Sequence, residues 1–246
     1  MQNDLRDLSK EEVIFLHHQA LHKTFFDELN MSSNDIEVTS NVENDKTWDY
    51  VMPLSSADFN FDNRNIYTPD FVNSNNHELI FQDSWMATLV MPQEKPVSSP
   101  DLTIAEVKND KEMNLFLEGF FQAYSGYDEH DPYGALPETY RAALWSSFKN
   151  PQAKLNFFYF MQRGALIAVS AIANIDNYSF LYCMGITPQF RGKGFYKQLL
   201  QHGHYFSQNN GGKFLILQTA KDSFVEKINL NNSFIIIDTI NYFKSK

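Results

Sequence analysis

The residues with the clearest chemical potential are the glycines and cations of the stretch PQFRGKGFYK. Gly192 and Gly194 leave room for a ligand to come close to the backbone. A helix that begins after Gly194 would present amides without partners and the positive end of its dipole, which suits a phosphate or diphosphate. Arg191, Lys193 and Lys197 gather positive charge at this place in a chain of net charge −10. The pattern therefore predicts an anion-binding site.

The elements on either side of this stretch are a strand and a helix. The apolar residues 180–184 predict a buried strand, and Pro188 ends it because proline cannot continue a central strand. After the glycines, Phe195, Leu199 and Phe206 recur with helical spacing. A strand-turn-helix crossover with two packing glycines is the alternative without a ligand. The chain has no glycine pattern of a Rossmann or Walker nucleotide loop around this site.

Thr-Pro before Arg-Gly-Lys-Gly-Phe, and Leu-Leu after it, resemble the coenzyme A signature of the GNAT (GCN5-related N-acetyltransferase) acyltransferases. The resemblance implies that the amides of residues 192–196 hold the diphosphate. It also implies that the preceding strand and the next one splay apart around the pantetheine arm, with a bulge at Gly185. The coenzyme-binding residues implied in this way are Met184, Gly185, Ile186, Arg191, Gly192, Lys193, Gly194, Phe195 and Tyr196.

The order of elements over residues 101–246 is similar to the GNAT fold along its full length. We expect a strand at 102–107, a helix capped by Asn109 or Asp110, a second helix from Pro137 to about Phe148, and a hairpin around residues 162–164. The strand and helix of the signature follow, then a strand at 213–218, a helix at 223–229 and two closing strands. The fold class is α+β, with a mixed, mostly antiparallel central sheet flanked by helices.

Residues 1–95 are expected to form an N-terminal α/β half, either an unrelated extension or a degenerate GNAT-like repeat. Ser9 to Glu12 predict a capped helix that runs to about Leu29, and residues 31–47 predict a loop. Strands are expected at 48–54 and 85–91, with short pieces around 67–72 and 79–81. The prolines of residues 92–100 predict a linker to the domain at 101–246.

Acyl transfer to an amine needs a neutral nucleophile and a proton for the departing thiolate. GNAT members often donate that proton from a tyrosine shortly before a Gly-Phe pair, but here the pair is Ser233-Phe234. Counting back without gaps puts Asn229 at the tyrosine position, a shifted count puts Phe224, Val225 or Lys227 there, and none of these residues is a phenol. Water, Tyr182 or Tyr196 is therefore the candidate acid, although either tyrosine can equally be a packed aromatic. The loop residues Asp128, Glu129 and His130 are candidates for the acceptor side and its base, or else a solvated turn.

The composition narrows the class of protein. Of the 246 residues, 43% are hydrophobic, enough for a sizeable core, and the single cysteine, Cys183, excludes an internal disulfide and predicts a buried, inert residue. His18 and His22 are spaced as a metal pair, but no zinc motif accompanies them, so we expect no metal. The acidic balance disfavours nucleic acid. The absence of a signal-peptide pattern and of a long apolar run favours a cytoplasmic protein with no membrane partner.

The resemblance to the GNAT family implies an N-acetyltransferase that uses acetyl-CoA as cosubstrate and an unidentified amine as acceptor, by direct transfer. The alternatives are a protein that binds acetyl-CoA without catalysis, or a protein-interaction module that uses the acidic N-terminal half. The sequence leaves the acceptor and the oligomeric state open.

Overall fold

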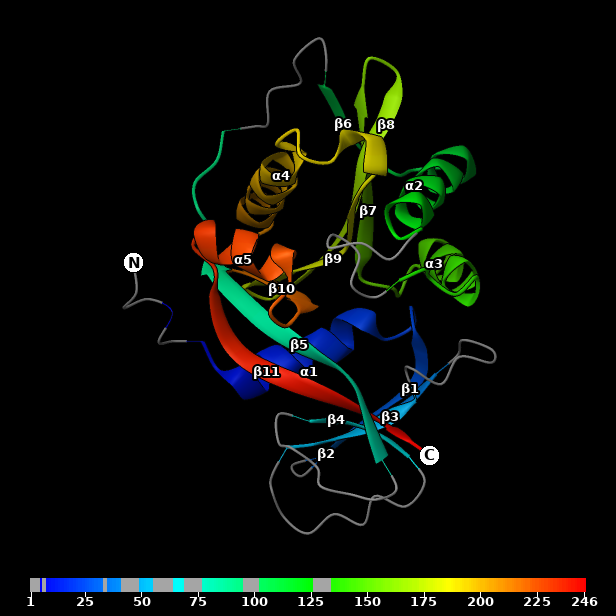
Figure 1. Cartoon of the computed structure of the whole chain (residues 1–246), viewed down its shortest axis with the longest axis vertical. Coiled ribbons are helices and arrows are strands. Elements are labelled where there is room, and N and C mark those ends of the chain that lie inside the picture. Colours follow the sequence, from blue (N-terminus) through cyan, green and yellow to red (C-terminus); the bar gives the residue numbers. More distant parts are fainter. Residues whose placement is uncertain are drawn as a thin grey trace. The chain divides into compact units, whose positions relative to one another are not determined.

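The computed structural model describes Leu5 and residues 8–32, 35–40, 49–54, 64–68, 77–94, 102–125 and 134–246 (Figure 1). The helices are α1 (Lys10–Leu21), α2 (Asp110–Ala123), α3 (Thr139–Lys149), the short 3-10 helix η3 (Pro188–Phe190), α4 (Phe195–Asn209) and α5 (Phe224–Asn231). The strands are β1 (Phe26–Met31), β2 (Asp35–Ser40), β3 (Tyr50–Pro53), β4 (Asn65–Thr68), β5 (His77–Leu89), β6 (Leu102–Glu106), β7 (Leu155–Gln162), β8 (Ala165–Ile175), β9 (Tyr178–Ile186), β10 (Phe214–Ala220) and β11 (Ile235–Ser245).

The chain divides into two compact units, and each unit is assembled from separated stretches. Unit 1 consists of Met1–Leu5, Thr88–Leu136 and Lys154–Leu217, and unit 2 consists of Arg6–Ala87, Pro137–Ala153 and Gln218–Lys246. The predicted linker falls mostly outside the described residues, so a boundary between domains at 1–95 and 101–246 stays a prediction.

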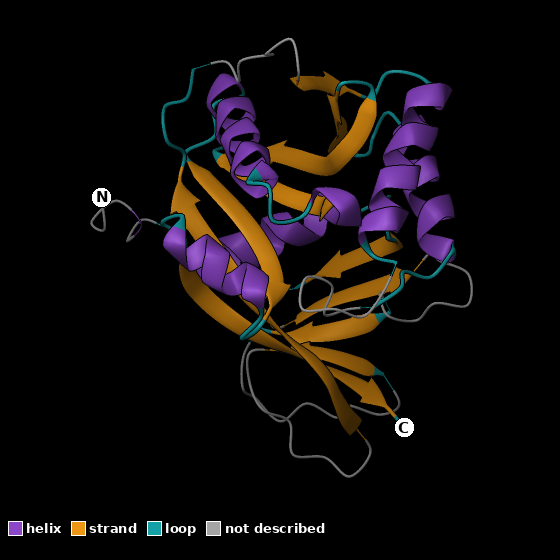
Figure 2. Cartoon of the chain, turned by 45° about the horizontal axis from the view of Figure 1, so that its top comes forward, coloured by secondary structure: helices purple, strands orange, loops and turns teal. Residues whose placement is uncertain are grey.

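Unit 1 contains a five-stranded sheet with a helix on each face. Strands β6, β7, β8 and β9 pair antiparallel in sequence order, and β10 pairs parallel with β9. The ring of Phe116 on α2 meets Phe157 with centroids 5.0 Å apart, whereas His202 on α4 meets Phe158 at 4.5 Å. Because adjacent strand residues point to opposite faces, α2 and α4 cover opposite faces of this sheet (Figure 2).

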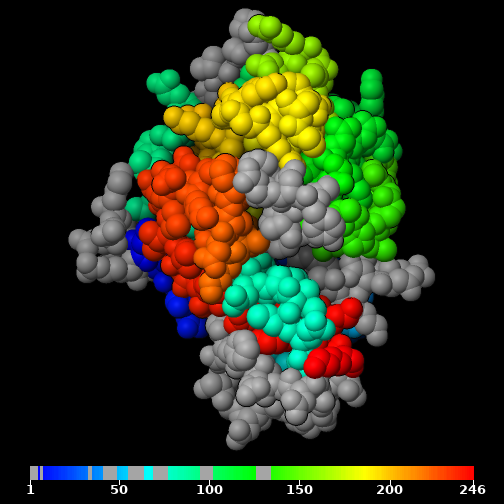
Figure 3. Space-filling view, in the orientation of Figure 1, coloured from blue at the N-terminus to red at the C-terminus, as the bar shows by residue number. Residues whose placement is uncertain are grey.

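The local signals of unit 1 are confirmed. Asn109 caps α2, and its side chain accepts a hydrogen bond of 3.1 Å from the amide of Glu112. Arg163 and Gly164 both take positive φ, 49° and 80°, in the predicted hairpin turn between β7 and β8. The strand, turn and helix of the signature are also present, and the segment of η3 and the start of α4, drawn in yellow, reaches the surface in Figure 3.

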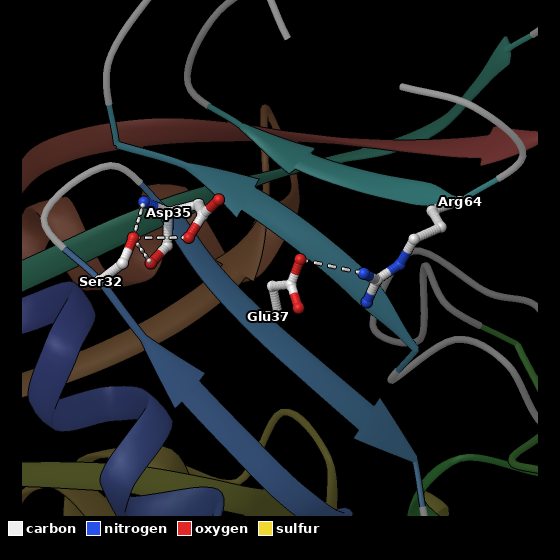
Figure 4. Close-up of polar contacts among 4 residues, drawn as sticks. All are labelled: Ser32, Asp35, Glu37 and Arg64. Atoms are coloured by element: carbon white, nitrogen blue, oxygen red, sulfur yellow. Dashed lines mark hydrogen bonds and ion pairs between the residues drawn. The ribbon is translucent and has the colours of Figure 1, made fainter. Parts of the chain in front are cut away.

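Unit 2 is built on a second mostly antiparallel set of strands. The order is β1, β2, β3, β4, β11, β5, in which β3 and β4 form the only parallel pair among the described residues. The side chain of Ser32 ends β1 by bonding Asp35 at the start of β2, with Oγ donating to Oδ1 at 2.6 Å (Figure 4). Arg64 forms an ion pair of 3.2 Å with Glu37 of β2. Ser9 caps α1 as predicted.

Three predictions for unit 2 are wrong. The first helix ends at Leu21 instead of about Leu29, because Lys23 takes a left-handed φ of 65° and turns the chain into β1. The predicted loop at 31–47 contains β2, in which Ile36 and Val38 are buried. The two predicted closing strands are one strand, β11, because a register shift between Ile236 and Asp238 lets the pairing with β5 continue.

Candidate active site

The two strands before and after the signature helix pair over only part of their length. Phe214 to Leu217 of β10 pair with Tyr178 to Leu181 of β9. Strand β9 then continues through residues 182–186, which have no partner on β10 within the described chain. The backbone edge of β9 is therefore open on that side where it approaches the signature loop, which is the splay that the resemblance implies.

A bulge on β9 lies inside this open stretch. Val169 of β8 pairs with Gly185 and Ala171 pairs with Tyr182, so that two residues, Cys183 and Met184, stand opposite one. Cys183 takes a left-handed φ of 48°. The bulge that the resemblance implies is present, but its extra residues precede Gly185, and the assignment of Gly185 itself as the bulge residue is wrong.

Position 185 requires glycine for a reason other than the bulge. A Cβ atom built on Gly185 would stand 2.5 Å from the Cβ atom of Ala123, the last residue of α2. Only glycine allows the end of α2 to come this close to β9. Helix α2 therefore packs directly against the strand that carries the bulge.

The glycine turn opens α4 with exposed backbone. Gly192 and Gly194 take left-handed φ angles of 71° and 83°, and a Cβ atom at either position would meet nothing within 4 Å. No side chain caps α4 at Gly194. Among the described residues, no acceptor lies within hydrogen-bond distance of the amides of residues 192–195. The turn is thus an open cradle of backbone donors at a helix N-terminus, and it fits an anion such as a diphosphate.

The basic side chains around this cradle differ in whether they are open to a ligand. Lys193 and Lys197 are exposed, and Nζ of Lys193 lies 5.1 Å from the centroid of the Phe190 ring. The guanidinium of Arg191 is engaged elsewhere, since its Nη2 donates to the carbonyl oxygen of Ala123 at 2.6 Å and its Nε donates to that of Ile186 at 3.3 Å. The two lysines therefore supply the positive charge that remains open to a ligand.

Of the two candidate acids, Tyr182 adjoins the bulge in the chain and Tyr196 adjoins the glycine turn. Tyr182 immediately precedes the bulge, is half-buried, and stacks on Phe180 with centroids 6.2 Å apart. Tyr196 is the second residue of α4 and is also half-buried. The candidate base residues Asp128 and Glu129, together with His130, lie outside the described residues, so their role stays a prediction.

Cys183 sits in the bulge but has the properties of an unreactive thiol. The residue as a whole is half-buried, and burial of the thiol itself raises its pKa to about 12. The thiolate is the nucleophilic form of cysteine, and almost none of it exists near neutral pH at such a pKa. This raised pKa favours an inert thiol at position 183, which stays a prediction.

The two histidines with the spacing of a metal pair, His18 and His22, are both hydrogen-bonded within the protein. The ring nitrogens of His18 lie 2.7 Å from the carbonyl oxygen of Ile14 and 2.9 Å from the hydroxyl of Tyr50, and Nε2 of His22 lies 3.0 Å from the carbonyl oxygen of Asp27. Within the described stretches no three His, Cys, Asp or Glu side chains gather as metal ligands. The independence from metal stays a prediction.

Two site residues were not predicted from the sequence. Tyr124 follows α2, and its hydroxyl donates a hydrogen bond of 2.8 Å to the carbonyl oxygen of Met184 in the bulge. Ala123 supplies the contacts to Gly185 and Arg191 described above. Tyr124 lies 60 positions before Met184 and Ala123 lies 68 positions before Arg191, and no local pattern indicates contacts at such separations.

The architecture has solved counterparts, although no family model and no curated protein matches the sequence. A GCN5-related N-acetyltransferase from Kribbella flavida is 11% identical with a TM-score of 0.64, over 95% of this chain and 94% of that one. A GCN5-related N-acetyltransferase from Sphaerobacter thermophilus is 12% identical with a TM-score of 0.59, over 97% and 86%. A conserved protein of unknown function from Staphylococcus epidermidis is 8% identical with a TM-score of 0.65, over 90% and 94%.

The chain therefore has the GNAT fold. The fold class is confirmed as a mixed, mostly antiparallel sheet flanked by helices, and the resemblance read from the glycine motif is confirmed at the level of the fold. None of the helices in the described parts has the length and apolar character needed to cross a membrane.

Proposed function

We propose that the protein is an acyl-CoA-dependent N-acyltransferase that transfers acetyl from acetyl-CoA to an amine. The observation that carries this proposal is the glycine turn at the start of α4, where the amides of residues 192–195 face no acceptor among the described residues. It lies directly after a strand whose edge is open and bulged. An anion cradle beside an open strand edge suits a ligand with a diphosphate and an extended amide-bearing arm.

The roles of the residues follow from this arrangement. The amides of residues 192–195 would hold the diphosphate, and Lys193 and Lys197 would offset its charge. Backbone groups at the open edge of β9, residues 182–186, would bond the amide groups of the arm as a neighbouring strand does. The coenzyme supplies an activated thioester, and the protein supplies orientation and proton handling.

The proton chemistry is the feature in which this chain differs from the GNAT pattern. Helix α5, where the family often has a tyrosine, carries none, and Asn229 stands at that position when it is counted back without gaps from Phe234. Tyr182 and Tyr196 are the phenols nearest the cradle and the bulge in sequence, and water is the remaining donor to the thiolate. An amine acceptor must lose a proton before or during attack, which the candidate carboxylates of Asp128 and Glu129 would accept.

The missing tyrosine on α5 also favours a second function, the binding of acetyl-CoA without catalysis. Asn229 is fully buried on α5 and cannot replace a phenol as an acid. A chain that kept the coenzyme cradle and lost the acid would bind acetyl-CoA without turnover. Incubation with acetyl-CoA and a panel of small amines, amino acids and peptides, followed by mass spectrometry, separates the two functions, because only the enzyme forms an acetylated product.

The coenzyme site itself is tested by thermal unfolding with and without acetyl-CoA. At about one hundred times the dissociation constant, a ligand of the native state contributes about 2.7 kcal/mol, which raises the melting temperature by roughly 5–10 °C in a chain of this size. We expect Gly194→Asp to abolish this rise by placing a carboxylate in the cradle. Gly194→Asn, which tolerates the left-handed backbone without charge, should keep part of it.

Gly211 provides the matched control for this variant. It takes a left-handed φ of 77°, its Cβ would also meet nothing within 4 Å, and it follows the C-terminal end of α4. Gly211→Asp therefore imposes the same backbone strain and charge away from the cradle, and should keep the full rise. An unaltered protein whose melting temperature does not change with acetyl-CoA would refute the proposed function.

A further inference from the structure

The end of α2 is joined to the candidate coenzyme site by two side chains. The hydroxyl of Tyr124 bonds the carbonyl oxygen of Met184 at 2.8 Å. The guanidinium of Arg191 bonds the carbonyl oxygens of Ala123 at 2.6 Å and of Ile186 at 3.3 Å. Three segments far apart in the sequence, namely the end of α2, the bulge of β9 and the signature loop, are thus connected around the point where Gly185 meets Ala123.

We propose that Tyr124 and Arg191 are positioning residues for the coenzyme, and that Arg191 does not bind the diphosphate although it belongs to the glycine motif. Tyr124 sets the orientation of the bulged peptide groups on β9, and Arg191 sets the angle at which the loop leaves the strand. This inference rests on the proposed function, because both residues act through the site that would hold coenzyme A.

The electrostatics of Arg191 favour a role on the backbone. Ala123 is the last residue of α2, and the final carbonyl groups of a helix lack intrahelical donors and carry the negative end of the dipole. A guanidinium placed there satisfies one of these carbonyls and offsets the dipole. Its second donor reaches Ile186 at the end of β9, so one planar group connects two elements.

The chemistry of Tyr124 is of the same kind. Its ring packs against Phe120 of α2 with centroids 5.1 Å apart, which holds the hydroxyl in place. The hydroxyl donates to Met184, one of the two bulged residues. A bulge leaves its peptide groups without regular partners, so a fixed donor on one carbonyl determines where the neighbouring groups point. Binding through main-chain groups depends on such preorganisation.

The two roles of Arg191 predict different responses to a lysine substitution and to salt. A diphosphate contact is mostly a charge contact, so Arg191→Lys would keep much of the affinity and Arg191→Met would reduce its salt dependence. A positioning role needs two donors in a plane. In that case Arg191→Lys should lose affinity as much as Arg191→Met, about tenfold or more, while the salt dependence stays that of the unaltered protein.

The experiment measures the affinity of the full chain for coenzyme A by calorimetry at about 0.05 M and about 0.3 M salt, below the melting temperature of every variant. Lys193→Met is the control for a true charge contact, and should lose affinity together with part of the salt dependence. Tyr124→Phe should lose roughly three- to tenfold, as expected for a hydrogen bond. Tyr205→Phe on α4 is its matched control, because no hydrogen bond of the Tyr205 hydroxyl exists within the described structure, and should lose nothing.

The outcomes separate this inference from the proposed function. If the unaltered protein binds no coenzyme A, the proposed function fails and this inference fails with it. If it binds, and Arg191→Lys keeps the parent affinity while Arg191→Met flattens the salt dependence, Arg191 is a diphosphate ligand and the inference is overturned. Parent affinity in both Arg191→Met and Tyr124→Phe would also overturn it.

Discussion

The amide of Met91 donates a hydrogen bond of 3.2 Å to Nδ1 of His204. One turn further along α4, the side-chain oxygen of Gln208 accepts a bond of 2.9 Å from the amide of Gln93. These two bonds attach the segment after β5 to the side of α4. The first bond requires a neutral ring, because an imidazolium carries a proton on both nitrogens and has no acceptor.

We therefore expect stability to fall in mild acid. Burial lowers the pKa of His204 to about 4, and has the same effect on His202 and on His18. An unfolded histidine titrates near 6.5, so the unfolded state binds more protons below that pH. The contribution of each of these histidines to the free energy of unfolding is fully present above about pH 6.5 and is lost as the pH falls toward about 4. At about pH 5 the loss is roughly 2 kcal/mol for each histidine. Urea unfolding at about pH 5 and above about pH 6.5 measures the loss in the free energy of unfolding.

His204→Asn tests how much of this loss of stability comes from the titration of His204. The side-chain oxygen of asparagine can accept from the same amide and does not titrate, so the loss between the two pH values should shrink by about one histidine's share. Gln208→Ala is the control, because it removes the neighbouring bond to Gln93 and no titrating group, so it should leave the loss between the two pH values as it was. An unchanged pH dependence in His204→Asn would contradict the prediction.

Gly185→Ala should destabilise the protein through the contact with Ala123. The new methyl group would start 2.5 Å from the Cβ atom of Ala123, and overpacking of this kind costs about 1–3 kcal/mol. The melting temperature of the variant reports this cost. The double variant that adds Ala123→Gly removes the opposing methyl and should recover part of the loss. Equal melting temperatures for Gly185→Ala and the parent would show that the end of α2 does not press on β9.

Cys183 should be slow to react with thiol reagents in the native protein. Its raised pKa leaves almost no thiolate at neutral pH, so labelling by a disulfide reagent should take place mainly after unfolding. Cys183→Ala should keep turnover within about threefold, because direct transfer needs no acylated cysteine. A stable acetylated Cys183 found by mass spectrometry, together with inactivity of Cys183→Ala, would instead place the thiol in the reaction.

The last prediction concerns the two candidate acids. If water protonates the thiolate, Tyr182→Phe and Tyr196→Phe should each cost less than about tenfold in turnover, below the range of 10² to 10⁴ typical of a positioned acid. Phenylalanine keeps the ring, so the stacking of Tyr182 on Phe180 survives and the comparison reports the hydroxyl. A loss near a thousandfold in one variant, with unchanged coenzyme affinity, would identify that tyrosine as the acid.

The parts of the fold that could be predicted are those with local causes. Pro188 ends a strand, glycines at 192 and 194 allow left-handed φ angles, and Asn109 caps a helix, whatever the rest of the chain does. The sequence around β2 in unit 2 contains a local signal for a strand and a stronger one for a loop. Ile36 and Val38 alternate with polar residues, as in a half-exposed strand, yet the surrounding Ser, Asn and Asp residues favoured a loop.

The parts that could not be predicted depend on distant partners. Nothing near Tyr124 in the sequence indicates that its hydroxyl meets Met184, and nothing near Arg191 indicates that its guanidinium turns to Ala123. The bulge predicted at Gly185 lies at the two residues before it, and position 185 needs glycine because the end of α2 comes close to it. Each of these contacts exists only after the strands have paired and α2 has packed on them.

The interleaving of the two units has a consequence for synthesis of the chain. Unit 2 combines Arg6–Ala87 with Pro137–Ala153 and Gln218–Lys246, so its strand β11 is synthesised after the other described strands, although it lies between β4 and β5 in the strand order. Until then, β4 and β5 lack the strand that separates them and expose unpaired edges. Before β11 has been synthesised, we therefore expect nascent chains to be prone to aggregate through these edges and to be unable to complete the folding of unit 2.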